Sequence, residues 1–339
     1  MTIFLYFINA VIIFFLFTNS NFVGKKLFLI DHPNSFRKKH LKPTPVVGGL
    51  FFFIFIFFYL LLDFSNVYNL NLNIFFKLNI QKIFFLFSFL FIFLIGILDD
   101  RVDLRPLTKI ILYIFISYLL FLTIPDIAIK TIRISFYKNI DLYEFSIFFS
   151  ILIFILFINS INMFDGINLQ SSSLFLVVWT YIGINFGFSE IIINIIIFLL
   201  IFSYFNLKQK VFLGDCGIYL LSFLSFVYLS KIYNLPSSTV YFDEIICLFL
   251  LPLTDILRVV LVRVKNGKSP LNADNIHFHH IIIKKNNFSF TIFLIVLGYL
   301  FPILFLKIFK INFILVLLFF LIYYFYLINF KQKKKLYFS

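Results

Sequence analysis

The segment Asp99-Asp100-Arg-Val-Asp103 places three carboxylates within five residues, directly after a long apolar run. Carboxylates this close repel one another, so such a cluster is typical of a site where a cation or a metal-bound phosphate neutralises them. The alternative interpretation is a solvated helix end with no chemical role.

A second motif reads Asn159-Ser-Ile-Asn162-Met-Phe-Asp165-Gly166-Ile-Asn168. If a helix continues through it, Asn159, Asn162 and Asp165 recur every three residues and line one face. Amide and carboxylate oxygens on one face suit Mg²⁺ ligation or hydrogen bonds to a nucleotide. Asn and Asp also cap and turn helices without further function, and the motif alone leaves both interpretations open.

A third motif, Phe212-Leu-Gly214-Asp215-Cys-Gly217, sets two glycines around a single carboxylate. Glycine lets the backbone approach a ligand closely, as a phosphate-bearing substrate requires, although a plain turn before the next helix has the same pattern. It is not a P-loop, because the Gly-Lys-Ser/Thr of that motif is absent.

The last polar segment combines acidic, basic and imidazole groups. Its members are Asp255, Arg258, Arg263, Lys268, Asp274, His277, His279 and His280. The histidine spacing resembles a zinc site, but no cysteine accompanies it and the neighbouring Arg and Lys repel a cation. Basic and imidazole donors together are better suited to holding a diphosphate. The cysteines, Cys216 and Cys247, form no spaced pattern and indicate neither a disulfide framework nor a metal site.

The elements that position these motifs are membrane spans. The chain is 62% hydrophobic and 13% charged, whereas soluble proteins have about 25% charged residues, and disordered chains have low hydrophobicity. Apolar runs predict an all-α integral membrane protein with about eleven transmembrane helices (ten is the alternative count), forming one domain over residues 1–339. The predicted spans are 2–18, 46–62, 82–98, 107–124, 145–161, 171–187, 190–205, 217–235, 244–263, 290–306 and 312–329.

The loops on the two sides of this predicted bundle differ in charge. With eleven spans, 21 of the 29 Lys and Arg residues lie on one side, which predicts an extracytoplasmic N-terminus and a cytoplasmic C-terminus. All five histidines and most of the aspartates lie on that same side, so a site is expected at the inner surface of the membrane. The net charge of +14 is thus mainly an orientation signal, and nucleic-acid binding is not expected. On the opposite side, Ile127–Tyr143 partly alternates and predicts a small β-hairpin that turns at Asn139.

Together these motifs resemble the polyprenyl-phosphate N-acetylhexosamine-1-phosphate transferases of glycosyltransferase family 4. The matching pieces, in the family's order, are Asp31-His-Pro-Asn34-Ser-Phe-Arg37-Lys38-Lys-His40 with Gly48-Gly49, Asp99-Asp100 with Lys109, Asn159 to Gly166, Gly214-Asp215-x-Gly217, and Asp274-x-x-His277-x-His279-His280. The chain departs from the family pattern at Asn168, where a second Asp is usual, at Leu169, where a glycine is usual, and at Ile218, where a Ser is common. Asp165 is therefore the stronger candidate than Asn168 for nucleotide contact.

The resemblance implies that polyprenyl (undecaprenyl) phosphate attacks a UDP-N-acetylhexosamine, releasing UMP and leaving a lipid-diphosphate sugar. Asp215 and Asn162 would hold Mg²⁺ (or Mn²⁺), while Asp99 would deprotonate or orient the lipid phosphate and Asp100 would help to hold the site. Lys109 and His279 would neutralise phosphate oxygens. The remaining expected substrate contacts are Asn159, Asp165, Asn168, Arg258, Asp274, His277 and His280.

The same resemblance implies residence in the inner (cytoplasmic) membrane, and a homodimer is compatible with it. Two alternatives stay open from the sequence. One is transfer of a phospho-N-acetylmuramoyl-pentapeptide in peptidoglycan synthesis, although the His-x-His-His form fits the UDP-N-acetylhexosamine branch better. The other is a transporter or flippase, whose polar groups usually lie near the middle of the bilayer rather than at one end.

Overall fold

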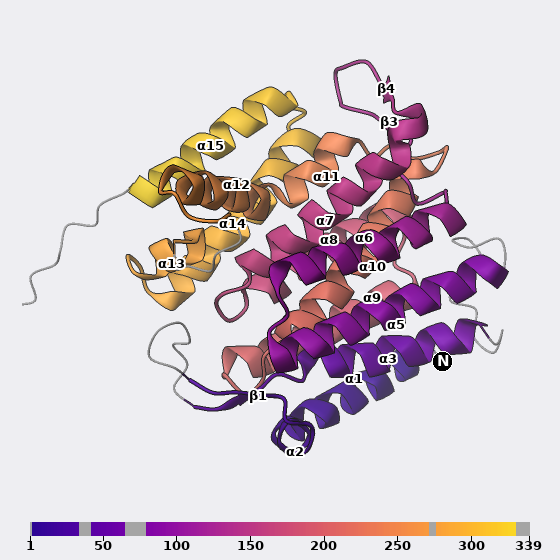
Figure 1. Cartoon of the computed structure of the whole chain (residues 1–339), viewed down its shortest axis with the longest axis vertical. Coiled ribbons are helices and arrows are strands. Elements are labelled where there is room, and N and C mark those ends of the chain that lie inside the picture. The colour runs from indigo at the N-terminus through magenta and orange to yellow at the C-terminus, as the bar shows by residue number, and fades with distance from the viewer. Residues whose placement is uncertain (1, 34–41, 65–78, 271–275, 330–339) are drawn as a thin grey trace, which may run out of the picture.

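The computed structural model describes residues 2–33, 42–64, 79–270 and 276–329, and within them the chain is a bundle of helices (Figure 1). In lipid, a helix satisfies every backbone hydrogen bond within one segment, which explains why each apolar run forms one. The helices are α1 (Thr2–Thr18), α2 (Ser20–Leu27), α3 (Gly48–Phe64), α5 (Asn79–Val102), α6 (Pro106–Thr123), the short 3₁₀ helix η1 (Tyr143–Phe145), α7 (Ser146–Phe164), α8 (Gln170–Phe186), α9 (Glu190–Leu207), α10 (Gly214–Asn234), α11 (Phe242–Leu248), α12 (Leu250–Lys265), α13 (Phe278–Ile283), α14 (Phe288–Lys307) and α15 (Phe313–Asn329).

Each predicted span coincides with one helix or with a bent pair of helices. The described part of the chain holds six helices that are long and apolar enough to cross a bilayer, or up to eight if each bent pair is one span. The bent pairs are α1 with α2, at 56°, and α11 with α12, at 72°. The helices at the other three predicted spans, α3, α8 and α15, have 17 residues each. The all-α membrane architecture is confirmed, whereas the count of eleven spans stays a prediction.

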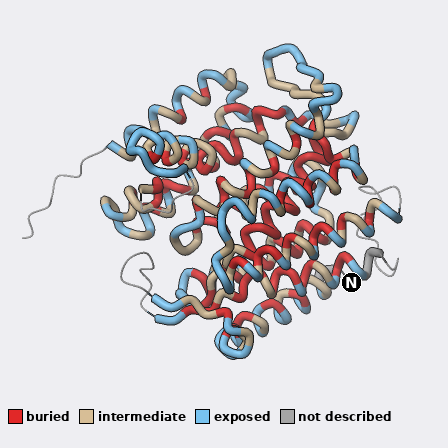
Figure 2. The backbone as a smooth tube through the Cα atoms, viewed as in Figure 1, coloured by how far each residue is buried: buried red, intermediate tan, exposed pale blue. Residues whose placement is uncertain are grey.

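Helix α10 lies at the centre of the bundle. It packs against α3, α5, α7 and α8, and every residue from Cys216 to Tyr233 is buried (Figure 2). Glycines allow the closest of these contacts: a Cβ added at Gly49 of α3 would lie 2.2 Å from the backbone N of Gly217. A Cβ at Gly96 of α5 would lie 2.3 Å from the Cα of Cys216. The first turn of α10 is therefore held by backbone-to-backbone packing on two sides.

Two small antiparallel hairpins complete the fold. Strand β1 (Ile30–Asp31) pairs with β2 (Thr44–Pro45), a pairing that the apolar pattern did not predict. Strand β3 (Thr131–Ile132) pairs with β4 (Ile140–Asp141), which confirms the predicted hairpin between the fourth and fifth spans. The predicted turn at Asn139 is wrong, because the chain reverses around Ser135 and Phe136, where Phe136 has a φ of 67°.

The two hairpins lie at opposite ends of the bundle (Figure 1). The β3–β4 hairpin lies at the end where α10 finishes, and the backbone N–H of Arg133 donates to the hydroxyl of Tyr233 near that end. The β1–β2 hairpin and α13 lie at the other end, where α10 begins. The predicted chemical motifs that the structure describes gather at this second end.

Candidate active site

The N-terminus of α10 is capped by a side chain from another helix. Asp100, near the end of α5, accepts hydrogen bonds from the backbone N–H of Asp215 at 2.7 Å and of Cys216 at 3.2 Å. A helix N-terminus carries unpaired N–H groups and partial positive charge, both of which favour a carboxylate. Gly214 has a φ of 77°, and a Cβ there would lie 2.7 Å from Oδ2 of Asp100. The backbone of the Gly214-Asp215 motif therefore packs against Asp100 and binds it. Asp100 is the residue that the sequence predicted to help hold the site.

The carboxylate of Asp99 accepts hydrogen bonds from three donors. Its Oδ2 pairs with the ammonium of Lys109 at 2.9 Å and also accepts the hydroxyl of Tyr219. Its Oδ1 accepts the backbone N–H of Leu104 at 2.8 Å. Only 4% of the residue is exposed. With these three donors in place, Asp99 is suited to orienting Lys109 and less suited to acting as a free base.

Asp99, Asp100 and Asp215 form an acidic cluster, whose carboxyl groups outnumber the cations that act on them. The charged groups that act on Asp215 are Asp100, Asp99 and Lys109, and Asp31 acts on Asp100 from the β1–β2 hairpin. Lys109 is thus one cation among several carboxylates. An oxygen-rich donor set with surplus negative charge fits Mg²⁺, which keeps several waters and takes one or two carboxylates. Among the residues described, no three His, Cys, Asp or Glu side chains form a complete set of metal ligands by themselves.

The end of α7 connects this cluster to the rest of the site. The Asn162 amide donates to the hydroxyl of Tyr219 at 3.2 Å, and the same hydroxyl donates to Asp99. Tyr219 follows Asp215 by four residues in α10, so the two share one face of that helix. Asn162, a predicted metal ligand, therefore lies within about one helical turn of Asp215. Asn159 instead donates back to the carbonyl of Ile155, at 2.8 Å.

Helix α7 continues past the predicted span through Asn159 and Asn162 and ends at Phe164, so Asp165 caps the helix, as the second of the two open interpretations has it. Asp165 is the next residue and has extended backbone angles, and its carboxylate accepts the hydroxyl of Ser171. The residue keeps a solvent-exposed surface, yet protein atoms crowd around its carboxyl group, and this burial raises the pKa of Asp165 to about 6. The hydrogen bond from Ser171 acts in the opposite direction.

The backbone explains why a glycine is usual at position 169. Leu169 has a φ of 67°, in the left-handed region that glycine adopts without strain. Its N–H donates to Oδ1 of Asn206 at 2.7 Å, and Asn206 in turn donates to the carbonyl of Val211 at 3.0 Å. The loop that carries Asp165 is thereby tied to the chain leading into the Gly214-Asp215 motif. Asn168 lies in this same loop.

The histidine segment, residues 277–280, is organised by Asp255. The carboxylate of Asp255 pairs with Nδ1 of His277 at 2.8 Å and with Arg258 at 2.8 Å, and it accepts the backbone N–H of Phe278 at 3.0 Å. The hydroxyl of Tyr324 donates to the same carboxylate at 2.7 Å. Arg258 also donates to the carbonyl of Ile276. Arg258 and Asp255 thus hold the histidine segment in position.

His279 lies against the loop that follows α7. A Cβ added at Gly166 would lie 2.0 Å from Nε2 of His279, and the ring of Phe164 packs edge-on against the imidazole at 5.8 Å. Burial lowers the pKa of His279 well below its usual value, and the neighbouring His280 and His277 act in the same direction. The imidazole is therefore neutral at physiological pH. The ring of His280 lies 4.2 Å from that of His279.

The structure thus brings most of the predicted site residues to one end of the bundle. Asp99, Asp100, Lys109, Asn162 and Asp215 form one group, and Asp165, Arg258, His277, His279 and His280 form a second. The end of α7 contacts both groups. Asp274 and the segment Asn34–His40 lie outside the described residues.

Sequence reasoning missed three residues of this arrangement. Tyr219 connects Asn162 to Asp99, Tyr324 binds Asp255 and Arg258, and Gln170 contacts His279. Tyr219 had a detectable signal, because a polar ring four residues after Asp215 shares its helix face. Tyr324 had none, because it lies in a run of similar aromatic residues.

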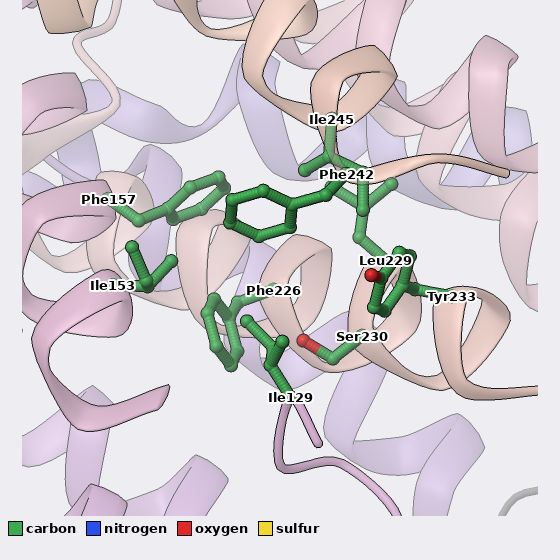
Figure 3. A pocket seen from close by; sticks show the side chains of 9 residues that line it. All are labelled: Ile129, Ile153, Phe157, Phe226, Leu229, Ser230, Tyr233, Phe242 and Ile245. Atoms are coloured by element: carbon green, nitrogen blue, oxygen red, sulfur yellow. The ribbon is translucent and has the colours of Figure 1, made fainter. Parts of the chain in front are cut away.

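A separate cavity lies between α7, α10 and α11, away from this site (Figure 3). It is lined by Ile129, Ile153, Phe157, Phe226, Leu229, Ser230, Tyr233, Phe242 and Ile245, none of which is charged. Tyr233 and Phe242 place it toward the β3–β4 end. It lacks the charged groups that phosphate chemistry needs.

Comparisons with known proteins agree with this geometry. Residues 82–232 match the model of glycosyl transferase family 4, a range that includes the acidic cluster, Lys109, Asn162 and Asp165. The chain is 23% identical over 294 residues to the undecaprenyl-phosphate alpha-N-acetylglucosaminyl 1-phosphate transferase of Salmonella typhi, which covers 82% of this chain and 76% of the relative. It is 25% identical over 291 residues to the Haemophilus influenzae protein with the same name, covering 82% and 77%. The matching motifs, their clustering at one end of a helical bundle and these similarities lead to one conclusion: over residues 82–232 the chain is similar to glycosyl transferase family 4.

Proposed function

We propose that the protein transfers a sugar-1-phosphate from a UDP-N-acetylhexosamine to polyprenyl phosphate, with undecaprenyl phosphate as the acceptor in the cell. The relatives named above are undecaprenyl-phosphate alpha-N-acetylglucosaminyl 1-phosphate transferases. UDP-N-acetylglucosamine is accordingly the first sugar donor to test.

The observation that carries this proposal is the acidic cluster at the N-terminus of α10. Asp99, Asp100 and Asp215 converge there from two helices, with Lys109 paired to Asp99 at 2.9 Å. A transporter has no evident use for surplus carboxylates at one end of the bundle, whereas a diphosphate-transferring enzyme needs groups that hold cations and phosphates. The family match favours the transferase over the transporter and over the muramoyl-pentapeptide alternative.

In the proposed reaction, an oxygen of the lipid phosphate forms a bond to the sugar-bearing β-phosphorus of the nucleotide. The bond between that phosphorus and the bridging oxygen breaks, and UMP leaves with the electron pair. The bond from the sugar to its phosphate oxygen stays intact, so the anomeric configuration is retained. A phosphate monoester is largely ionised at neutral pH, so the nucleophile needs positioning more than deprotonation.

Each residue of the site would have a distinct role in this reaction. Lys109, held by Asp99, neutralises a phosphate oxygen. Asp100 fixes the first turn of α10 and thereby the backbone of Asp215. Asp165 and its loop contact the nucleotide, and the histidine segment donates hydrogen bonds to diphosphate oxygens. A Mg²⁺ held by Asp215 and Asn162 would neutralise the charge that develops on the diphosphate.

The proposed location follows from the acceptor. A polyprenyl phosphate keeps its chain in the hydrocarbon and its phosphate at headgroup depth, and the site lies at one end of the helices. We propose that this end faces the cytoplasm, where UDP-sugars are made, and that the protein lies in the bacterial inner membrane. The excess of Lys and Arg on the loops of that end supports this orientation.

The experiment that tests this function is product analysis with purified protein in detergent. The protein is supplied with undecaprenyl phosphate, Mg²⁺ and each of several UDP-sugars, and UMP and the lipid-linked product are measured. We expect UMP and a lipid-diphosphate N-acetylhexosamine in equal amounts, and none without the acceptor lipid. Release of UDP, or hydrolysis that does not depend on the lipid, would contradict the proposal.

A further inference from the structure

Gln170, the first residue of α8, bridges two parts of the site. Its Oε1 accepts the backbone N–H of Gly166 at 3.3 Å, and its Nε2 lies 3.2 Å from Nδ1 of His279. The side chain is fully buried. Gln170 therefore connects the loop that carries Asp165 to the histidine segment. Gln170 and His279 are 109 residues apart in the sequence.

The two contacts of Gln170 determine which hydrogen-bonding roles are available. Because the backbone N–H of Gly166 is a donor, it must meet the amide oxygen of Gln170, which turns the amide nitrogen toward His279. An amide nitrogen only donates, so Nδ1 of His279 must be the acceptor. In a neutral imidazole, the ring proton then lies on Nε2.

The Nε2 atom of His279 is buried and has no hydrogen-bond partner among the described residues. His279 as a whole is 1% exposed. A buried donor without an acceptor is costly, and such groups in native proteins call for an explanation. An acceptor that arrives with a substrate supplies one.

We propose that Gln170 is a positioning residue that holds His279 as the Nε2–H tautomer, so that this N–H donates to an oxygen of the bound nucleotide diphosphate. The inference rests on the proposed function for the identity of the acceptor, but its tautomer claim does not. Position 170 also follows Asn168 and Leu169, where the chain departs from its family pattern. The relay from Gly166 through Gln170 to His279 thus runs directly beside these two departures.

The titratable groups around His279 define what a change at position 170 will do. His277 and His280 lie beside it on its own segment, and Asp255 acts on it from α12. The facing loop contributes Gly166 and Gln170, which do not titrate. Gln170→Glu keeps the size of the side chain but replaces the donor to Nδ1 with an acceptor. A carboxylate there favours a proton on Nδ1, which gives either the other neutral tautomer or an imidazolium.

The test combines spectroscopy with kinetics on the full-length protein in detergent. Nitrogen NMR of ¹⁵N-histidine-labelled protein, assigned with His279→Gln, reports the tautomer of His279 without any substrate. We expect the Nε2–H form in the unmodified protein, a mixture in Gln170→Met, and Nδ1 protonation in Gln170→Glu. Asn185→Asp, an amide-to-carboxylate change near the other end of α8, is the matched control and should leave the His279 signal unchanged.

In the transferase assay, both Gln170 variants should lose about 10- to 100-fold in turnover, as changes to residues that orient a functional histidine do. The pH profile of Gln170→Glu should acquire a new titration, whereas that of Gln170→Met should not. Two results would overturn the proposal: His279 protonated on Nδ1 in the unmodified protein, or unchanged tautomer and pH profile in Gln170→Glu. If the tautomers behave as expected but the protein transfers no sugar phosphate, the proposed function fails and the role of Gln170 in setting the tautomer stands.

Discussion

The backbone N–H of Asp215 donates to Oδ1 of Asp100 at 2.7 Å, across 115 residues of sequence. This bond joins the end of α5 to the start of α10, so two carboxylates that repel each other are held side by side. The helix N-terminus offsets part of the repulsion at Asp100, because its N–H groups bind that carboxylate directly. The carboxylate of Asp215 is left among the charges of Asp99, Asp100 and Lys109.

Gly214→Ala should disrupt this arrangement. A Cβ at Gly214 would lie 2.5 Å from Cγ1 of Val46 and 2.7 Å from Oδ2 of Asp100, at a φ of 77°. We expect a loss of about 3 kcal/mol in stability from strain and overpacking, together with a large fall in turnover. Gly187→Ala is the control, because its φ is 92° and nothing lies within 4 Å of the added atom. It should cost about 1–3 kcal/mol in stability from backbone strain alone and leave turnover unchanged. Equal effects of the two changes on melting temperature and turnover would argue against a specific role for the Gly214–Asp100 contact.

Tyr219→Phe should remove the hydrogen bonds that connect Asn162 of α7 to Asp99 of the acidic cluster. The change removes one hydroxyl that binds both Asp99 and Asn162, in a residue that is 1% exposed. A buried hydrogen bond to a charged group contributes about 1.5–3 kcal/mol, so turnover should fall at least roughly tenfold. Tyr118→Phe, on the exposed face of α6, is the matched control and should have no effect. Normal turnover in Tyr219→Phe would exclude a functional link between Asn162 and the acidic cluster.

The sequence predicted the helices and the loop motifs well, because both depend on local patterns. Apolar runs fixed where α5, α7 and α10 lie, and glycine and aspartate spacing marked their ends. The contacts of Tyr219 and Gln170 depend on how the helices rotate against one another, which no local pattern encodes. The turn at Phe136 was mispredicted because it depends on tertiary contacts, such as the hydrogen bond from the neighbouring Ser135 to Asp243, that override local propensity.

Asp165 gives the folded protein a dependence on pH. Burial raises its pKa from 3.8 to about 6, so the folded state binds this proton more tightly than the unfolded chain does. The stabilisation from this protonation is fully present below the unfolded pKa of 3.8 and is lost as pH rises toward about 6. The Asn side chain of Asp165→Asn cannot titrate. The melting temperature of the variant minus that of the unmodified protein should therefore increase between pH about 4 and about 6 and stay constant at higher pH. A constant difference across this range would show that burial does not perturb Asp165.

The orientation of the chain is tested by labelling single cysteines in spheroplasts with an impermeant thiol reagent. Cys216 and Cys247 are buried, so the background labelling should be low. We expect Lys138→Cys, in the loop of the β3–β4 hairpin, to react from outside, and Lys335→Cys to react only after the membrane is permeabilised. Labelling of Lys335→Cys in sealed spheroplasts would reverse the proposed topology and move the site to the outer surface.

The most direct test of the account is lipid-dependent UMP release by Asp215→Asn. The substitution keeps the shape of the side chain and its backbone bond to Asp100, but it removes the charge proposed to hold Mg²⁺. We expect turnover with undecaprenyl phosphate and UDP-N-acetylglucosamine to fall on the order of a thousandfold, with the melting temperature nearly unchanged. Asp103→Asn, in the same acidic segment but exposed, should have a much milder effect. Near-normal, Mg²⁺-dependent turnover in Asp215→Asn would contradict the account and move the metal site to Asp99 and Asp100.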